Sequence, residues 1–243
     1  MKKLNTKDLD APLVPFLYIL IGIIAIASAF TFHQQYNGYI WILIYGLLMI
    51  GMGAIFINTS INGKQKIWNH IIAKQKINPN SEVLDLGTGH GLVLLKFANH
   101  LSDDGHATGI DLWRNSDQSN NNIQNTQQII KQNHLEHIVN IETANMIKLP
   151  FESNKYDYVV SGLAFHNIKP ASARTNALKE ATRVLSDNGT LIIVDTGHHK
   201  KEYLKELTNL GMAIIETKTY GISGWWTGPW MPTYSIIAKK NHV

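Results

Sequence analysis

A glycine-rich turn directly after a short apolar run constrains the fold of this chain more than any other feature. Residues 83–91 read Val-Leu-Asp-Leu-Gly-Thr-Gly-His-Gly. Apolar runs of this length that end in glycine are typical of buried parallel strands. Gly87, Gly89 and Gly91 can adopt positive φ, so the backbone can turn tightly against a ligand, and the free N–H groups of the following helix would point at it. The stretch predicts a strand–turn–helix unit with a ligand site at the turn.

Strand-like and helix-like segments alternate from residue 81 onward. We expect strands at residues 83–86, 106–112, 138–143, 156–161 and 190–195, and helices at 92–101, about 117–133, 171–185 and 201–210. Two further strand-like runs, 213–220 and 234–239, suit a closing antiparallel pair. This order predicts an α/β domain with seven strands, mostly parallel, and helices on both faces of the sheet.

Two long uncharged apolar runs precede this domain, at residues 13–32 and 39–57. A helix of about 20 residues rises about 1.5 Å per residue and so crosses a hydrocarbon layer of about 30 Å. Small residues that could let two such helices approach each other are Gly22, Ala25, Ala29, Gly46 and Gly53. The sequence therefore predicts a transmembrane hairpin within an N-terminal membrane anchor, residues 1–60.

Charge predicts the orientation of this hairpin. Lysines precede the first run and follow the second, whereas the connection at residues 33–38 has none, so both ends are expected in the cytoplasm. Two alternatives remain open. The first run, with Lys2, Lys3 and the small residues 27–29, resembles a cleaved signal peptide, which would leave the second span as the anchor. A buried hairpin of a soluble protein is disfavoured because both runs are apolar all round.

An amphipathic helix is expected in residues 61–80, between the anchor and the glycine turn. Ile67, Trp68, Ile71 and Ile72 recur at helical spacing, with lysines around them. Such a helix can lie on the membrane surface, or it can be an ordinary packing helix of the following domain. Both interpretations stay open.

Polar residues at strand ends are the candidates for ligand binding, because ligands of open α/β sheets bind beyond the carboxyl ends of the strands. Asp111 ends the second strand, roughly 20 residues after the glycine turn, where a carboxylate can accept hydrogen bonds from ribose hydroxyls. A dinucleotide fingerprint would need a third glycine where Leu92 stands. Asp85 would also repel a pyrophosphate, although it suits a cationic amino acid group. A nicotinamide-dependent oxidoreductase is therefore disfavoured.

The acidic and glycine-rich pattern at residues 85–91 resembles the first motif of class I S-adenosylmethionine-dependent methyltransferases, and the order of segments up to residue 195 extends the resemblance. The resemblance implies a Rossmann-like methyltransferase domain at residues 81–243, with S-adenosylmethionine as its cofactor. The implied cofactor-binding residues are Asp85, Gly87, Thr88, Gly89, Gly91, Asp111, Leu112, Asn145, Met146 and Ser161. Asn145 stands where aspartate is commoner, but its amide oxygen can still accept a hydrogen bond from the adenine amino group.

The loop after the fourth strand meets the acceptor in the family that the chain resembles. His166 in this loop is the candidate general base, since imidazole can take a proton near neutral pH. The alternative is that His166 only bonds to its neighbours and that positioning of the acceptor supplies most of the acceleration. The domain resembles enzymes that methylate quinones, lipids and sterols, in particular an uncharacterised bacterial set with N-terminal membrane spans.

These observations together predict a membrane-anchored methyltransferase of a bacterial inner membrane, with a cytoplasmic catalytic domain and a small, lipophilic acceptor. A non-catalytic sensor or scaffold that binds S-adenosylmethionine is the competing class. The resemblance implies neither the acceptor nor the oligomeric state.

Composition excludes several other classes. The net charge is +4 and no basic stripe is interleaved with aromatics, so no nucleic-acid partner is expected. The absence of cysteine excludes disulfides, thiolate metal sites and a cysteine nucleophile. The 11 histidines are expected at the surface and no metal site is predicted. Three tryptophans in residues 224–232 could bind an acceptor, enter a membrane interface or pack in the core, and all three readings stay open.

Overall fold

The structure is a computed structural model that describes residues 9–114 and 120–240. The chain divides into two compact units. Among the described residues, one unit contains 9–67 together with the distant segment Tyr220–Pro232, and the other contains Trp68–Thr219 and the last strand.

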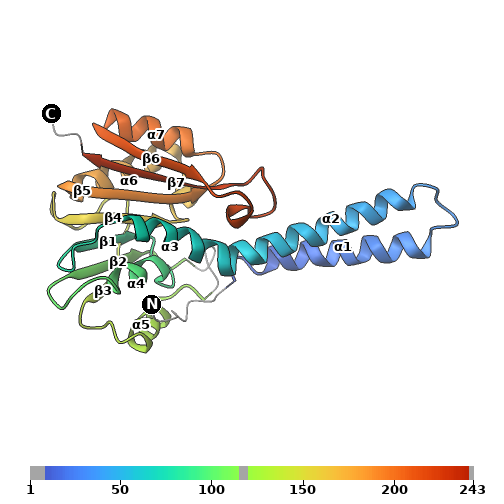
Figure 1. The fold of residues 1–243 in the computed structure, drawn as a ribbon, viewed down its shortest axis with the longest axis horizontal. Helices are drawn as coiled ribbons and strands as arrows, with labels where there is room; N and C mark the ends of the chain where they lie inside the picture. Colours follow the sequence, from blue (N-terminus) through green and yellow to red (C-terminus); the bar gives the residue numbers. More distant parts are fainter. Residues whose placement is uncertain (1–8, 115–119, 241–243) are drawn as a thin grey trace. The chain divides into compact units, whose positions relative to one another are not determined.

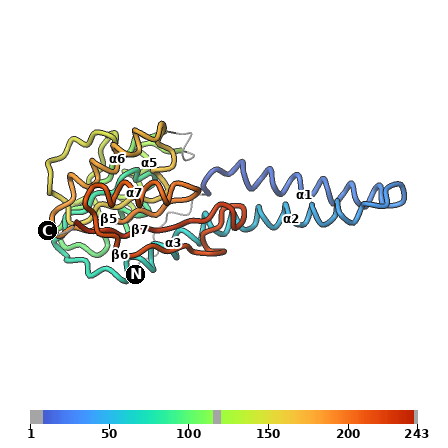
Figure 2. Tube along the Cα trace, turned by 90° about the horizontal axis from the view of Figure 1, so that it is seen from above, coloured from blue at the N-terminus to red at the C-terminus, as the bar shows by residue number. Residues whose placement is uncertain are grey.

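Two antiparallel helices dominate the first unit. α1 spans Leu13–Thr31 and α2 spans Tyr39–Asn58, and they run side by side in both views (Figures 1 and 2). A Cβ added to Gly22 would lie 2.7 Å from the carbonyl oxygen of Gly46, and one added to Gly46 would lie 2.8 Å from that of Gly22. The predicted close approach at these glycines is therefore confirmed.

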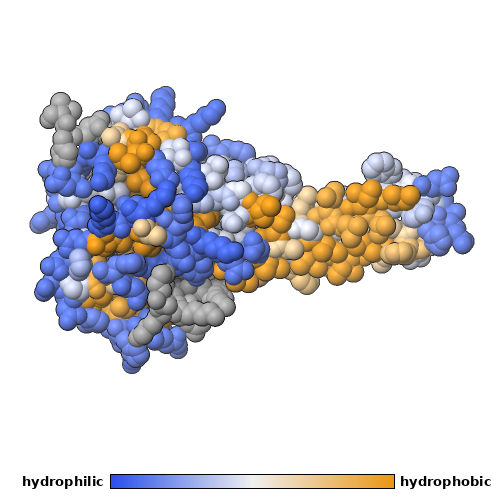
Figure 3. Space-filling model, viewed as in Figure 1, coloured by the Kyte–Doolittle hydropathy of each residue, from blue (hydrophilic) through white to orange (hydrophobic). Residues whose placement is uncertain are grey.

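The outward face of this helical hairpin is apolar. The most exposed of its large apolar side chains are Trp41, Phe30, Leu13, Phe16, Leu47 and Ile24. Figure 3 shows this surface as a continuous apolar zone along both helices, with polar residues at the connecting turn. Both helices are long and apolar enough to cross a membrane by length and composition.

α2 does not stop at its last apolar residue. A π-helical turn, Thr59–Gly63, leads directly into α3, Lys64–Lys74. Within the second unit, the ring of Trp68 on α3 packs edge-on to Phe97, with centroids 6.4 Å apart, and Ile71 is buried. Of the two interpretations for residues 61–80, the ordinary packing helix is favoured.

The second unit is built on one seven-stranded sheet with strand order β3-β2-β1-β4-β5-β7-β6 (Figure 1). The strands are β1 Glu82–Leu86, β2 His106–Asp111, β3 Val139–Thr143, β4 Tyr156–Gly162, β5 Leu185–Thr196, β6 Met212–Thr219 and β7 Thr233–Lys240. β7 pairs antiparallel with both β5 and β6, and the other pairings are parallel. The predicted fold class is confirmed. The strand order reverses between β1 and β4, which is where ligands bind in such sheets.

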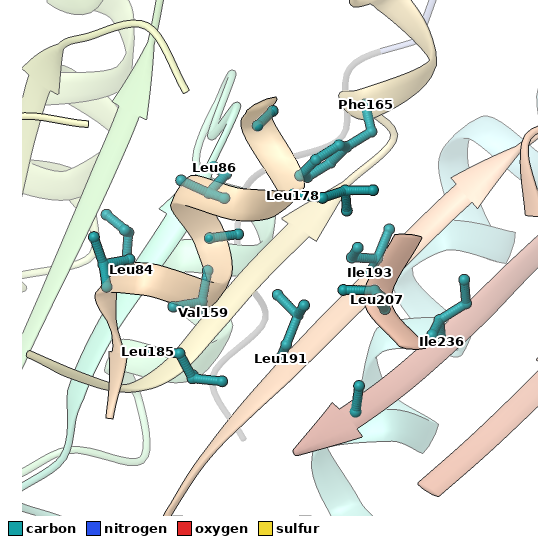
Figure 4. Close-up of a cluster of buried hydrophobic side chains, with 14 of the residues drawn as sticks. Leu84, Leu86, Val159, Phe165, Leu178, Leu185, Leu191, Ile193, Leu207 and Ile236 are labelled. Atoms are coloured by element: carbon teal, nitrogen blue, oxygen red, sulfur yellow. The ribbon is translucent and has the colours of Figure 1, made fainter. Parts of the chain in front are cut away.

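Helices pack on both faces of this sheet: α4 Leu92–Ala98, α5 Ile123–Gln132, α6 Ala171–Val184 and α7 Lys200–Asn209. The main core lies between the strands and helices α6 and α7 (Figure 4). Leu84, Val159 and Ile193 of the strands meet Leu178 of α6 and Leu207 of α7 there. Burial of each such side chain stabilises the fold by about 1.5–3 kcal/mol, and it fixes the strand ends that carry the site.

Three element boundaries differ from the sequence prediction by three residues or more. The helix expected from about residue 117 begins at Ile123, after Asn122 caps it by accepting a hydrogen bond from the Asn125 N–H; residues 115–119 lie outside the described part. α4 ends earlier, at Ala98. β5 begins earlier, because Leu185 already pairs with Tyr156 of β4 although the polar segment after it reads as a turn.

Candidate active site

The glycine turn after β1 has the predicted left-handed backbone. The φ angles of Gly87, Gly89 and Gly91 are +75°, +50° and +79°, a region that residues with a Cβ rarely adopt. A Cβ added to Gly87 would overlap the Cβ of Ala164 and lie 3.3 Å from Cε of Met146. The turn is therefore in direct contact with the loops that follow β3 and β4, and three strand ends meet at one place.

Asp85 lies beneath this turn and holds it. Its Oδ2 atom accepts hydrogen bonds from the Thr88 hydroxyl at 2.8 Å and from the Leu94 N–H at 3.1 Å. Burial raises the pKa of Asp85 to about 7, against the opposing effect of these two hydrogen bonds. Its Oδ1 atom is buried and has no hydrogen-bond partner among the described residues. A cationic amino group at Oδ1 would favour the ionised carboxylate, and this contact stays a prediction.

Asp111 stands at the end of β2, opposite the turn. Its Oδ2 accepts the Gly89 N–H at 2.9 Å, and its Oδ1 accepts the Trp113 N–H at 2.7 Å and the Asn121 side-chain amide at 3.2 Å. A carboxylate has about four lone-pair sites, so Asp111 can still accept hydrogen bonds from a ribose. Leu112 beside it is 39% exposed, and its contact with the cofactor stays a prediction.

Three further predicted residues also lie at this edge of the sheet, with their polar groups bonded within the protein. The Asn145 Oδ1 accepts the Ile147 N–H at 3.1 Å. The buried Ser161 hydroxyl donates to the backbone carbonyl of Leu86 at 2.8 Å and so links β4 to β1. The Thr88 hydroxyl is bonded to Asp85. Direct contacts of these side chains with a cofactor stay predictions.

The loop after β4, which is predicted to meet the acceptor, packs against a buried carboxylate, Asp195, close to the end of β5. His166 lies on the short helical turn Phe165–Asn167 after β4, and its Nδ1 is 2.5 Å from the Asp195 Oδ1. The hydroxyl of Tyr203, on α7, donates to the Asp195 Oδ2 at 2.9 Å. The Thr196 N–H donates to Oδ1 at 2.9 Å. Several hydrogen bonds to the one carboxylate thus offset the free-energy cost of burying it as a charge.

The phenols around Asp195 remain neutral at physiological pH. Burial raises the pKa of Tyr203 well above its usual range, and the charge of Asp195 raises it further. Burial likewise raises the pKa of Tyr234 on β7, whose ring centroid lies 6.3 Å from that of Tyr203. Tyr203 therefore acts as a hydrogen-bond donor to Asp195. His166, whose side chain is 29% exposed, is the member of this group that other molecules can reach.

A second ion pair holds the loop that carries His166. Arg174 on α6 forms two hydrogen bonds of 2.8 Å to the two carboxylate oxygens of Glu202 on α7, and its Nη1 donates to the backbone carbonyl of Ile168 at 2.8 Å. This paired geometry is the strong form of the arginine–carboxylate interaction. It fixes the segment two residues after His166 against both helices.

Sequence reasoning found His166 but gave no role to Asp195, Tyr203 or Tyr234. Asp195 had a usable signal, because it is a carboxylate near the carboxyl end of a predicted strand. Tyr203 had none, since an aromatic residue in an amphipathic helix reads as a core residue.

The architecture and the site together define a class of protein. A seven-stranded sheet with an antiparallel β7, a glycine turn after β1 and a carboxylate at the end of β2 is the arrangement of class I methyltransferases. Residues 77–233 match the family described as a methyltransferase domain, so the chain belongs to this methyltransferase family.

Individual relatives agree with this class. The chain is 28% identical over 163 residues to the ubiquinone/menaquinone biosynthesis C-methyltransferase of Rickettsia felis, which covers 67% of this chain and 63% of that protein. It is 28% identical over 134 residues to the demethylmenaquinone methyltransferase of Listeria welshimeri, which covers 55% of this chain and 52% of that protein. The chain thus spans less than two thirds of the length of these curated relatives.

A solved structure shows the same fold. The S-adenosylmethionine-dependent methyltransferase from Aquifex aeolicus superimposes with a TM-score of 0.55 at 17% identity, over 70% of this chain and 88% of that one. The chain accordingly contains a methyltransferase domain of the S-adenosylmethionine-dependent class, as the sequence predicts.

Proposed function

We propose that this methyltransferase is anchored in a bacterial inner membrane by the hairpin α1–α2 and methylates a small, lipophilic acceptor from the cytoplasmic side. The observation that carries the anchor is the outward apolar surface of both helices. Each large apolar side chain that is fully exposed to water forgoes about 1.5–3 kcal/mol of burial energy. A bilayer offers that burial, and the lysines that flank the hairpin favour cytoplasmic ends.

The proposed acceptor class has two supports. The relatives from Rickettsia felis and Listeria welshimeri are named for quinone biosynthesis. An anchored enzyme also meets a membrane-dissolved acceptor at a raised effective concentration, which a water-soluble acceptor would not need.

The proposed chemistry divides between the two sides of the site. S-adenosylmethionine, when bound, supplies a methyl group on a positively charged sulfur. Asp111 would hold the ribose, Leu112 and Met146 would flank the adenine, and Asp85 would bind the ammonium of the amino acid end.

His166 is the proposed general base on the acceptor side. Asp195 accepts the hydrogen bond from Nδ1–H and so selects the tautomer in which Nε2 carries the lone pair. Nε2 takes the proton that the acceptor loses, and the carboxylate of Asp195 then stabilises the imidazolium.

The test uses the full chain reconstituted in vesicles made from bacterial lipid extract, with S-adenosylmethionine labelled on its methyl group. We expect label in the organic phase after extraction, and the His166→Gln variant serves as the control with an intact cofactor side. Label confined to water-soluble products would overturn the lipophilic acceptor. Release of the chain from membranes by alkaline carbonate would separately overturn the anchor.

A further inference from the structure

The segment Tyr220–Pro232, here called the tryptophan loop, connects β6 to β7 yet belongs to the unit that contains the hairpin. The ring of Trp226 packs edge-on to Phe56 on the last turns of α2, with centroids 5.1 Å apart. The Thr59 hydroxyl donates a hydrogen bond to the backbone carbonyl of Trp225. Together these contacts fix the loop to the end of the second apolar helix.

A glycine in the π-helical turn makes the approach closer still. A Cβ added to Gly63 would overlap the backbone carbonyl oxygen of Ser223. The loop backbone and the helix backbone are therefore in direct contact at this position, and the loop cannot be regarded as a loose surface connection.

The first charged side chains beyond the apolar runs lie where the tryptophan loop is attached. Ser60 and Lys64, one turn apart, both donate hydrogen bonds of 2.8 Å to the Asp10 Oδ2, and Asp10 lies just ahead of α1. An ion pair that closes the end of two uncharged helices marks the depth at which a bilayer would change from hydrocarbon to headgroups.

The loop carries apolar side chains outward at this depth. Ile222 is 61% exposed, Trp230 is 53% exposed and Met231 is 38% exposed, and residues 220–232 contain no charged residue. The loop also closes on itself: the Met231 N–H donates to Gly228 at 3.2 Å, and the Trp230 indole N–H donates to the Thr227 hydroxyl at 3.0 Å. Internal hydrogen bonds of this kind lower the cost of leaving water.

We propose that the tryptophan loop is a third membrane-contacting element, which inserts Ile222, Trp230 and Met231 into the interfacial layer of the bilayer that holds α1 and α2. This inference rests on the proposed anchor. Lipid is the favoured partner because the exposed side chains are an aromatic ring, an aliphatic chain and a thioether chain on a loop without charged residues, and because the loop is attached to the apolar helix itself.

The absence of cysteine from the chain allows a clean test. Single cysteines introduced as Ile222→Cys and Met231→Cys in the full chain would be labelled with a nitroxide and reconstituted in vesicles of phosphatidylethanolamine and phosphatidylglycerol. Accessibility to oxygen, relative to a water-soluble nickel chelate, reports depth. Leu47→Cys on α2 is the control for the hydrocarbon, and Ile215→Cys on β6 is the matched control for an exposed apolar residue of the other unit.

We expect the oxygen-to-nickel ratio at positions 222 and 231 to be several-fold above that at 215 and below that at 47. Ratios at 222 and 231 equal to that at 215, with a high ratio at 47, would overturn the loop proposal and leave the anchor intact. A low ratio at 47 as well would overturn the anchor and the loop proposal with it. Circular dichroism and retained methyl transfer establish that each labelled variant is folded.

Discussion

The two sides of the site are built in different ways. On the proposed cofactor side, the site is shaped largely by the backbone. The Gly89 N–H donates a hydrogen bond to Asp111, and glycines with positive φ let the strand ends meet. On the proposed acceptor side, side chains from α7 and the loop after β4 converge on Asp195 of β5. Substitutions around Asp195 can therefore change proton transfer from the acceptor without changing the affinity for the cofactor. Substitutions should separate the two: changes on one side alter cofactor affinity, and changes on the other alter turnover.

The largest effect is expected for His166→Gln. Glutamine keeps the size and hydrogen bonding of the side chain but cannot take a proton, so kcat should fall by about 10²–10⁴-fold. The dissociation constant for S-adenosylmethionine should stay unchanged, because His166 lies on the acceptor side. Single-turnover methyl transfer and calorimetry measure the two quantities, and unchanged turnover would show that His166 is not the general base and only bonds to its neighbours.

Asp195→Asn sharpens the same test. The amide removes the charge that stabilises a protonated His166, so kcat should fall and the acidic limb of its pH profile should move to lower pH. A purely structural role would lower the amount of folded enzyme without moving that limb. Tyr203→Phe, which removes one donor to Asp195, should have an effect in the same assay that is smaller than that of either substitution.

Asp111→Asn is expected to act on the cofactor side alone. Hydrogen bonds to charged groups contribute about 1.5–3 kcal/mol, which corresponds to roughly tenfold to a hundredfold or more in affinity. Calorimetry with S-adenosylmethionine should show this loss, while the pH profile of kcat at saturating cofactor keeps its shape. A changed profile with unchanged affinity would reverse the assignment of the two sides.

Gly87→Ala tests the close approach of the glycine turn to Ala164, and a matched control separates it from the strain of a positive φ. Gly197 provides the matched control, since its φ is +81° but a Cβ there would meet nothing within 4 Å. Both substitutions carry the left-handed penalty of about 1–2 kcal/mol, and Gly87→Ala adds overlap with Ala164, typically worth about 1–3 kcal/mol. Thermal unfolding in detergent should therefore rank Gly87→Ala below Gly197→Ala, and equal values would contradict the close approach.

The smallest effect concerns the pH dependence of stability. The pKa of Asp85 is raised to about 7, above its ordinary value of 3.8, so the folded state keeps its proton in a range where the unfolded state has lost it. Stability should therefore fall as pH rises from about 4 to about 7. Asp85→Asn should flatten this slope in unfolding measured without cofactor, and an unchanged slope would assign it to other groups.

The difference between the two sides also explains what the sequence could predict. The glycine turn and Asp111 are ordered along the chain by the βαβ unit, so their spacing carries information. Asp195, Tyr203 and His166 come together only through tertiary packing, and no local spacing encodes that meeting. The loop at residues 224–232 shows the same limit, because Trp226 packs on Phe56 while Trp230 stays exposed, and nothing in the local pattern distinguishes them.

The hairpin unit is completed by a segment near the other end of the chain. During synthesis the two apolar helices leave the ribosome before the sheet does, and residues 220–232 of the same unit follow only after β1 to β6 have been translated. Domains generally fold in the order in which they are made, but the hairpin unit can be completed only after residues 220–232 have been translated. An interrupted translation product that stops before residue 220 would still carry both helices yet lack Trp225 and Trp226, so assembly of the hairpin unit depends on translation of the chain through β6.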